Sequence, residues 1–232
     1  MMKANQPNNN WIAVMAISVL LILVSSVSVS ANNGTEKTIS ITAKSTDNYQ
    51  ARVSKLFDDG YETVDVTFTD LEEEKLDCSN SSLVSPSANT KSIGPIKTYY
   101  IKNARKVADY VGTARLASTD GPPGVRIWIE TTKSVSSTYS GQFGASVKSI
   151  SAAEGWSVTG STSVSIGGDY TVPYKVGKKT VKRGHLEAYP KYKTKKYDVY
   201  YGIQGTTNEV KKGTGTARKA IGVSFKKYNT YK

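Results

Sequence analysis

The segment from Thr131 to Gly168 alternates between apolar residues and Ser, Thr or Gly, and only three of its residues are charged. Side chains of a β-strand point to opposite faces in turn, so this period predicts strands with one apolar and one hydroxyl-rich face. The apolar positions change frame between Val147 and Ile150, which predicts a turn near Lys148–Gly155 and hence a long amphipathic hairpin. The candidate positions on its apolar face are Val135, Tyr139, Phe143, Val147, Ile150, Trp156, Val158, Val164 and Ile166.

The flanking regions predict a β-rich fold with a small α/β portion near the N-terminus. Thr38–Ala43 and Val64–Phe68 alternate like strands, and between them apolar residues recur at helical spacing before Gly60. Further strands are expected at Lys97–Lys102, Tyr110–Ser118, Val125–Glu130 and Gly215–Lys227. A Pro- and Gly-rich cluster at 120–124 predicts a reversal that joins the second and third of these as a hairpin. We expect a mainly β fold, an elongated antiparallel sandwich with a small α/β N-terminal portion.

Residues 1–31 have the three parts of a secretory signal peptide. Lys3 gives a basic start, Trp11–Val24 is an apolar run, and Val29-Ser30-Ala31 supplies the small residues that precede a cleavage site. As a helix the apolar run would span only about 21 Å, against about 30 Å for the hydrocarbon core of a bilayer. Cleavage near Ala31 is therefore favoured over anchoring, and we expect a secreted chain.

Charge divides the rest of the chain into an acidic and a basic part. Residues 32–95 carry 6 basic and 11 acidic side chains, whereas residues 96–232 carry 24 and 8, and the whole chain has a net charge of +12. The boundary at 79–95 is rich in Ser, Asn, Pro and Gly, which is typical of a linker. We predict a signal peptide at 1–31, a small acidic N-terminal subdomain and linker at 32–95, and a basic antiparallel β domain at 96–232.

Residues 175–201 combine many lysines with interleaved tyrosines. A basic face on an exported protein attracts an anionic membrane or an anionic cell-envelope polymer. Export argues against nucleic acid, although basic aromatic strands also bind single strands. Two structural readings stay open, because lysines also protect an edge strand from pairing and strand tyrosines often belong to a core. The candidates for anionic-surface binding are Lys178, Lys179, Lys182, Arg183, Lys191, Lys193, Lys195 and Lys196.

The inventory of one Cys and one His excludes most catalytic and metal-binding templates. A Ser-His-Asp arrangement would need His185, but the sequence has no Gly-x-Ser-x-Gly nucleophile motif. A Cys-His pair would need Cys78, which lies on the other side of the predicted linker from His185. The chain has no Walker loop, and no dinucleotide fingerprint follows a strand. We expect no enzymatic activity, no cofactor and no metal. Cys78 is either a free thiol or an intermolecular link.

The amphipathic hairpin has two interpretations. A strand crosses a bilayer with about 9–11 residues, apolar side outward and polar side inward, in a closed ring of strands. Ser and Thr tolerate both a soluble resting state and a wet lumen. A half-exposed strand of an ordinary sandwich alternates in the same way and inserts into nothing.

Thr131–Gly168, with the following Asp169-Tyr170-Thr171-Val172-Pro173 and Gly177-Lys178-Lys179, resembles the transmembrane-hairpin region of the aerolysin-like β-pore-forming toxins. It is also similar to uncharacterised secreted proteins of Gram-positive bacteria that share this layout. The resemblance covers Val111 to Val199. It implies an elongated β-rich protomer whose copies assemble into a ring on a membrane.

Two functional hypotheses follow from these patterns. The first is a secreted membrane-active or cell-envelope-binding protein that inserts the hairpin after assembly, as a β-pore-forming toxin does. The second is a secreted β-sandwich that binds an anionic surface polymer, or serves a structural role, without inserting. Insertion requires that Phe143, Trp156 and Val164 can leave whatever they pack against in the soluble chain.

Overall fold

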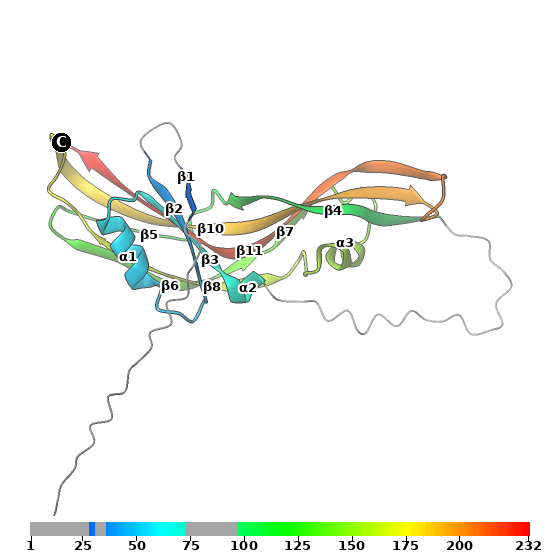
Figure 1. Ribbon diagram of the computed structural model, residues 1–232, viewed down its shortest axis with the longest axis horizontal. Coiled ribbons are helices and arrows are strands. Elements are labelled where there is room, and N and C mark those ends of the chain that lie inside the picture. The colour runs from blue at the N-terminus through cyan, green and yellow to red at the C-terminus, as the bar shows by residue number, and fades with distance from the viewer. Residues whose placement is uncertain (1–27, 31–35, 73–96) are drawn as a thin grey trace, which may run out of the picture.

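The computed structural model describes residues 28–30, 36–72 and 97–232. Its longest elements are β10 (Lys179–Gly202) and β11 (Glu209–Tyr231), which pair antiparallel and run the length of the molecule (Figure 1). Their register shifts at three points, and such bulges increase the twist of a long ribbon. The strand predicted at Gly215–Lys227 lies within β11.

Within the described residues, nine strands form one sheet around this long hairpin, in the order β1-β2-β3-β11-β10-β4, while β5 and β9 pair with β10 and β7 pairs with β11. All of these pairs are antiparallel except the parallel pair of β2 and β3. The remaining strands of this sheet are β1 (Ser28–Ser30), β2 (Thr38–Ala43), β3 (Thr63–Phe68), β4 (Thr98–Val111), β5 (Ala117–Gly121), β7 (Thr138–Ser140) and β9 (Lys175–Val176).

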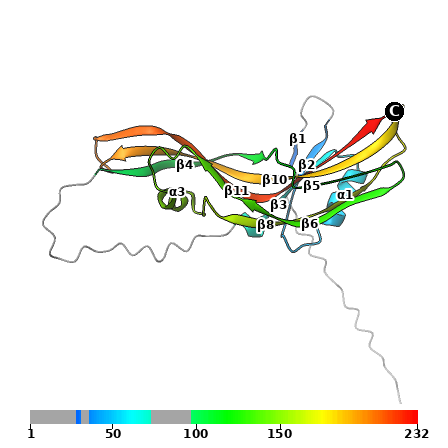
Figure 2. The same ribbon diagram turned by 180° about the vertical axis from the view of Figure 1, so that it is seen from behind.

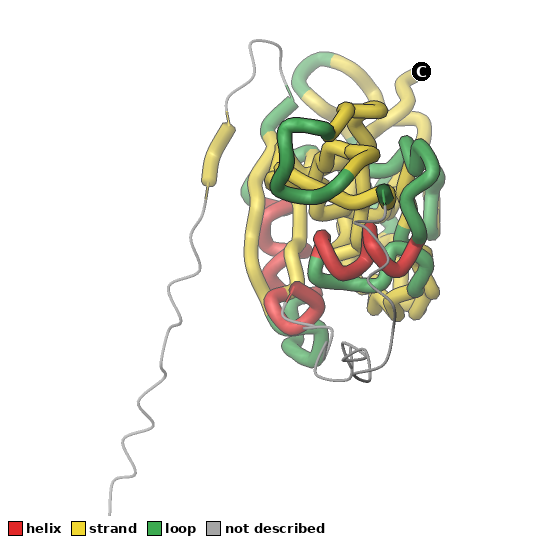
Figure 3. Tube along the Cα trace, turned by 90° about the vertical axis from the view of Figure 1, so that its right-hand side faces the viewer, coloured by secondary structure: helices red, strands yellow, loops and turns green. Residues whose placement is uncertain are grey.

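A second layer consists of β6 (Arg126–Ser136) and β8 (Ser161–Thr171), which pair with each other (Figure 2). Helix α1 (Gln50–Asp58) packs against β8, and α2 (Thr69–Glu72) follows β3. Helix α3 (Val147–Glu154) lies close to β4. The view along the long axis shows the helices beside the strands (Figure 3). The mainly β sandwich predicted from the sequence, with a small α/β N-terminal portion, is confirmed.

Two apolar clusters hold the layers together. The larger one joins β2, α1 and β3 to the inner faces of β6 and β8 and to the half of β10–β11 that carries the C-terminus. The smaller one lies beneath the other half of the hairpin and includes Tyr197, Val199 and Ala217. Burial alternates along β2 and β3, as their period of two predicted.

The N-terminal segment shares its sheet and its core with the rest of the chain. Strand β3 pairs with β11 from Thr63 to Thr67, and Phe57 of α1 belongs to the larger cluster. The described part of the acidic segment, residues 36–72, therefore packs into the same core as the strands of the basic part. The predicted linker at 79–95, Cys78 and most of the predicted signal peptide lie outside the described residues, and Ser28–Ser30 form the edge strand β1.

Two expectations for the region after residue 97 were wrong. The strand predicted at Tyr110–Ser118 is interrupted, because β4 ends at Val111 and the ladder on β10 meets Pro190, which has no N–H to donate. The predicted hairpin is absent from this region, since β5 pairs with β10 whereas β6 pairs with β8. The reversal after Gly121 instead carries the chain from one layer to the other. No helix of the described ranges is both long and apolar enough to cross a membrane.

Candidate membrane-inserting segment

Strands β6 and β8 form a two-stranded sheet with two chemically distinct faces. Their register pairs Ile127 with Tyr170, Thr131 with Ile166, and Val135 with Thr162 on the face that meets the larger cluster. The outer face is lined by hydroxyls at alternate positions, namely Ser134, Ser136, Ser161, Ser163 and Thr132. The predicted alternation is therefore present in both strands, with the apolar face inward.

The connection between the two strands differs from the predicted turn. Residues 137–160 form β7, which pairs with β11, and then helix α3. The side chain of Ser146 accepts a hydrogen bond from the Ser149 N–H at 3.1 Å and caps the start of the helix. Gly155 ends it in the left-handed conformation at φ 82°. The stretch predicted as a turn is thus a capped helix.

Helix α3 and the residues after it pack onto the long hairpin. Ile150, Trp156 and Val158 are buried against Tyr197 and Val199 of β10 in the smaller cluster. On β8, Val164 and Ile166 are buried in the larger cluster. Two of the three side chains that insertion must release, Trp156 and Val164, therefore lie in interiors shared with distant strands. Phe143 is different, with 46% of its surface exposed.

The free energy that holds this segment closed follows from these side chains. Burying a large apolar side chain contributes about 1.5–3 kcal/mol. Moving Ile150, Trp156, Val158, Val164 and Ile166 into water together would then cost on the order of 10 kcal/mol, as much as the total stability of many domains. This burial keeps the segment closed in water.

Backbone hydrogen bonds add little to this closure. Within the described residues, β6 and β8 have no strand partner except each other. Tyr49 bridges α1 to β8, because its hydroxyl donates to the Ser165 carbonyl and accepts from the Gly167 N–H, both at 2.9 Å. The main backbone link to the large sheet is the three-residue pairing of β7 with β11. Side-chain packing rather than a continuous ladder holds the segment in place.

Polar groups in the smaller cluster weaken the closed arrangement. The carboxylate of Glu154 and the indole N–H of Trp156 are both buried. Among the described residues, neither group has a hydrogen-bond partner. Lys195 approaches Glu154 at 3.8 Å, donates to its backbone carbonyl at 2.6 Å, and lies 4.7 Å from the Trp156 ring centre. Burial raises the pKa of Glu154 to about 7, and Lys195 offsets only part of that effect. Each unsatisfied buried group costs about 1–3 kcal/mol.

The turn that leads into α3 is strained. Phe143 has φ 46°, a left-handed conformation that a residue with a bulky side chain rarely adopts, and it stands between Gly141 and Gly144, whose φ values are also positive. Its ring lies where a side chain at Gly213 of β11 would be. Residues 141–156, between β7 and β8, therefore combine a strained backbone position with buried polar groups that lack a hydrogen-bond partner.

Four of the predicted surface-binding residues gather at one end of the molecule. Lys178 and Lys179 lie at the turn between β9 and β10, and Lys182 and Arg183 follow on β10, all exposed. Arg183 is paired with Asp120 of β5. The same end carries exposed apolar side chains, with Tyr174 at 70% and Val176 at 43% exposure, and the added cation Lys175. We call Tyr174, Lys175, Val176, Lys178, Lys179 and Lys182 the basic end.

The other predicted surface-binding residues do not belong to this group. Lys191 is buried beside Asp65 of β3 at 3.6 Å, so its inclusion was wrong. Lys195 is occupied with Glu154 and Trp156, as described above, and Lys193 is half-buried. Lys196 is exposed but lies toward the C-terminal end of β10, away from the basic end. The sequence could not show these differences, because the partners are distant along the chain.

The interleaved tyrosines and the single histidine have structural partners. The rings of Tyr99 and Tyr201 lie 4.7 Å apart and are tilted by 45°, whereas His185 stacks on Tyr228 at 4.7 Å. Tyr197 is fully buried. Hydrogen bonds from Lys211 and neighbouring side chains lower the pKa of Asp198 below its usual range. No cluster of three or more His, Cys, Asp or Glu side chains suited to a metal ion occurs in the part of the chain that the structure describes.

Comparison with known proteins adds no family to this picture. The sequence matches no protein-family model, and no curated protein is similar enough to count as a match. The functional conclusion therefore rests on the geometry of the segment and of the basic end.

Proposed function

We propose that this chain is a secreted, membrane-active protein that docks through its basic end and then inserts residues 131–168 as an amphipathic hairpin, together with other copies of itself. The observation that carries the proposal is the separate sheet of β6 and β8, with an apolar face turned inward and a hydroxyl-rich face turned outward. Extended further through 137–160, the same alternation would give two strands long enough to cross a bilayer. The resemblance to aerolysin-like β-pore-forming toxins points the same way.

The distribution of strain and packing supports release of this particular segment. Its apolar side chains are as well sheltered by lipid as by the protein interior, and refolding into a hydrogen-bonded hairpin would relieve the strained backbone of Phe143. Functional elements that must move are commonly the places where local rules are broken. The rest of the large sheet keeps its continuous ladder between β10 and β11.

The basic end supplies the first contact with the membrane. Each exposed cation near an anionic bilayer contributes about 1 kcal/mol, and the attraction weakens as salt rises. Tyr and other amphipathic rings favour the headgroup region. Tyr174 and Val176 therefore suit an interfacial position beside Lys178 and Lys179.

A reversible disulfide tests insertion directly. Ser140 of β7 and Thr216 of β11 are cross-strand partners, so cysteines at both positions are close enough to form a disulfide. In a Cys78→Ser background, the oxidised Ser140→Cys/Thr216→Cys chain should fail to release dye from anionic liposomes, and a reductant should restore release. The control Thr63→Cys/Lys226→Cys links β3 to β11, outside the segment, and should release dye in both states.

The second candidate function is binding to an anionic surface polymer without insertion. The burial of Trp156 and Val164 in shared interiors favours it. Insertion would be contradicted if the wild-type chain bound anionic liposomes without releasing dye. Equal release by the oxidised and reduced Ser140→Cys/Thr216→Cys chain would contradict it too, and either result would leave this second function.

A further inference from the structure

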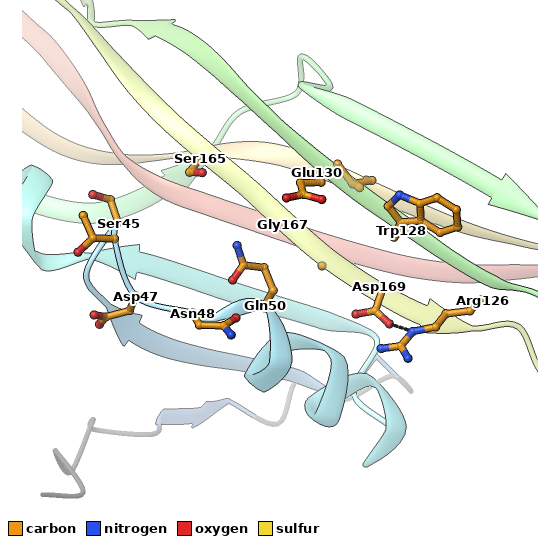
Figure 4. Close-up of a pocket in the computed structure, with 13 residues that line it drawn as sticks. Ser45, Asp47, Asn48, Gln50, Arg126, Trp128, Glu130, Ser165, Gly167 and Asp169 are labelled. Atoms are coloured by element: carbon orange, nitrogen blue, oxygen red, sulfur yellow. Dashed lines mark hydrogen bonds and ion pairs between the residues drawn. The ribbon is translucent and has the colours of Figure 1, made fainter. Parts of the chain in front are cut away.

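A groove of about 710 Å³ opens between the N-terminal portion and the outer face of β6 and β8 (Figure 4). One wall is the loop Ser45–Asn48 with Gln50 of α1, and the other carries Arg126, Trp128 and Glu130, three successive outward-facing residues of β6. The floor is β8 at Gly167, where a Cβ atom would collide with Gln50. The volume lies in the usual range for sites that bind small molecules.

Trp128 is the dominant apolar surface in this groove. It is 66% exposed, whereas its neighbours Ile127 and Ile129 are buried and fix the strand beneath it. The face of an indole ring carries partial negative charge and attracts the weakly positive C–H groups that line one face of a sugar ring. An exposed indole beside a polar wall is therefore suited to stacking against a pyranose.

The polar side chains of the groove have unused hydrogen-bonding capacity. Within the described residues, no hydrogen bond or ion pair involves the side chains of Glu130, Asn48 or Gln50, while Asp47 accepts only the Lys44 N–H at 2.8 Å. A carboxylate accepts from two hydroxyls, and an amide both donates and accepts. These groups match neighbouring hydroxyls on a sugar, which donate and accept in the same way.

The charge of the groove narrows the class of ligand. Arg126 is paired with Asp169, so Asp47 and Glu130 are left as unpaired negative charges in a chain whose net charge is +12. Anionic sugars and anionic lipid headgroups would be repelled here. A Trp that anchors a protein to an anionic bilayer would be better placed among basic residues, as at the basic end.

We propose that this groove binds a neutral saccharide, stacked on Trp128 and hydrogen-bonded by Glu130, Asn48 and Gln50. The site recognises uncharged glycan on a surface. This site is separate from the basic end. Saccharide binding there requires no insertion, so the proposal can be tested independently of pore formation.

Calorimetric titration of the full chain with lactose, cellobiose and N,N′-diacetylchitobiose tests the proposal, with 3′-sialyllactose as the anionic probe. At least one neutral disaccharide should bind, and Trp128→Ala should weaken that binding about tenfold. Glu130→Gln should also weaken it, whereas Tyr174→Ala, which removes an exposed aromatic outside the groove, should not. Sialyllactose should bind more weakly than lactose.

Because Trp128 and Glu130 are exposed, neither substitution should disturb folding, which circular dichroism checks. Failure of all three neutral disaccharides to bind would overturn the proposal. So would binding that survives Trp128→Ala unchanged, tighter binding of sialyllactose than of lactose, or a Trp128→Ala defect confined to liposome binding.

Discussion

Replacing Glu154 by Gln should stabilise the folded chain at alkaline pH. The carboxyl is 1% exposed, neither of its oxygens has a hydrogen-bond partner among the described residues, and the Lys195 ammonium is 3.8 Å away. A Gln side chain has nearly the same shape and carries no charge, so the substitution removes the cost of burying a carboxylate. It leaves the packing of Ile150 and Trp156 in place.

The magnitude follows from the pKa of the group. Burial raises the pKa of Glu154 from 4.5 to about 7. The folded chain therefore binds this proton more tightly than the unfolded chain, so the contribution to stability is fully present below pH 4.5 and is lost as the pH rises through 7. A difference of about 2.5 pKa units corresponds to about 3 kcal/mol. Glu154→Gln should thus gain up to about 3 kcal/mol over the wild type near pH 8 and almost nothing near pH 4.5.

Urea unfolding of the wild type and the variant between about pH 4.5 and pH 8 measures this difference. The comparison cancels the other carboxyls of the chain, such as Asp198 and Glu187, whose lowered pKa values act in the opposite direction. The exposed Glu130→Gln serves as the matched control and should give a flat difference. A Glu154→Gln gain that does not change with pH, or a loss of stability near pH 8, would refute the reasoning.

Three further predictions concern insertion, docking and packing. Val147→Asp should abolish dye release, because it places a charge on the apolar frame. Ser146→Asp should retain dye release, since position 146 lies on the hydroxyl frame and Asp also caps a helix. Equal release by the two variants would contradict the assignment of faces. Lys179→Glu with Lys182→Glu should weaken binding to anionic liposomes at least tenfold at low salt, and a co-sedimentation assay that shows no loss would exclude the basic end as the docking site. Gly222→Ala should lower the free energy of unfolding by more than about 2 kcal/mol, because its Cβ would overlap the Val66 carbonyl oxygen of β3. An unchanged urea midpoint would contradict this, since it would mean that β3 and β11 separate at this point without cost.

The sequence predicted the elements whose pattern is local. Strands β2 and β3 and helix α1 lie where alternation and helical spacing placed them, and the apolar frames of β6 and β8 are correct. The turn at the middle of the hairpin was wrong for a geometric reason. Val147 and Ile150 are three residues apart, a step that reverses the frame of a strand but keeps two side chains on one face of a helix. The cap at Ser146 and the stop at Gly155 were the signals that distinguish the two.

Contacts between distant segments lay beyond a pattern read along the chain. Lys191 and Lys195 belong to the basic stretch in sequence, yet the fold brings them to Asp65 and Glu154. The burial of Glu154 is likewise invisible in the sequence, because it depends on packing against β10. Trp128 gave no signal of its own, because a groove exists only where the loop before α1 faces the outer side of β6.

Accessibility of neighbouring positions on liposomes tests insertion most directly. An environment-sensitive fluorophore would be attached to single cysteines at Thr131, Thr132, Thr162 and Ser163 in a Cys78→Ser background, and its quenching compared between lipid-borne and water-soluble quenchers. Thr131 and Thr162 lie on the apolar frame, so their probes should respond to the lipid-borne quencher. Probes at Thr132 and Ser163 should respond to the soluble one. Bound protein whose neighbouring probes behave alike, with no access to the lipid-borne quencher, would contradict a hairpin that crosses the membrane.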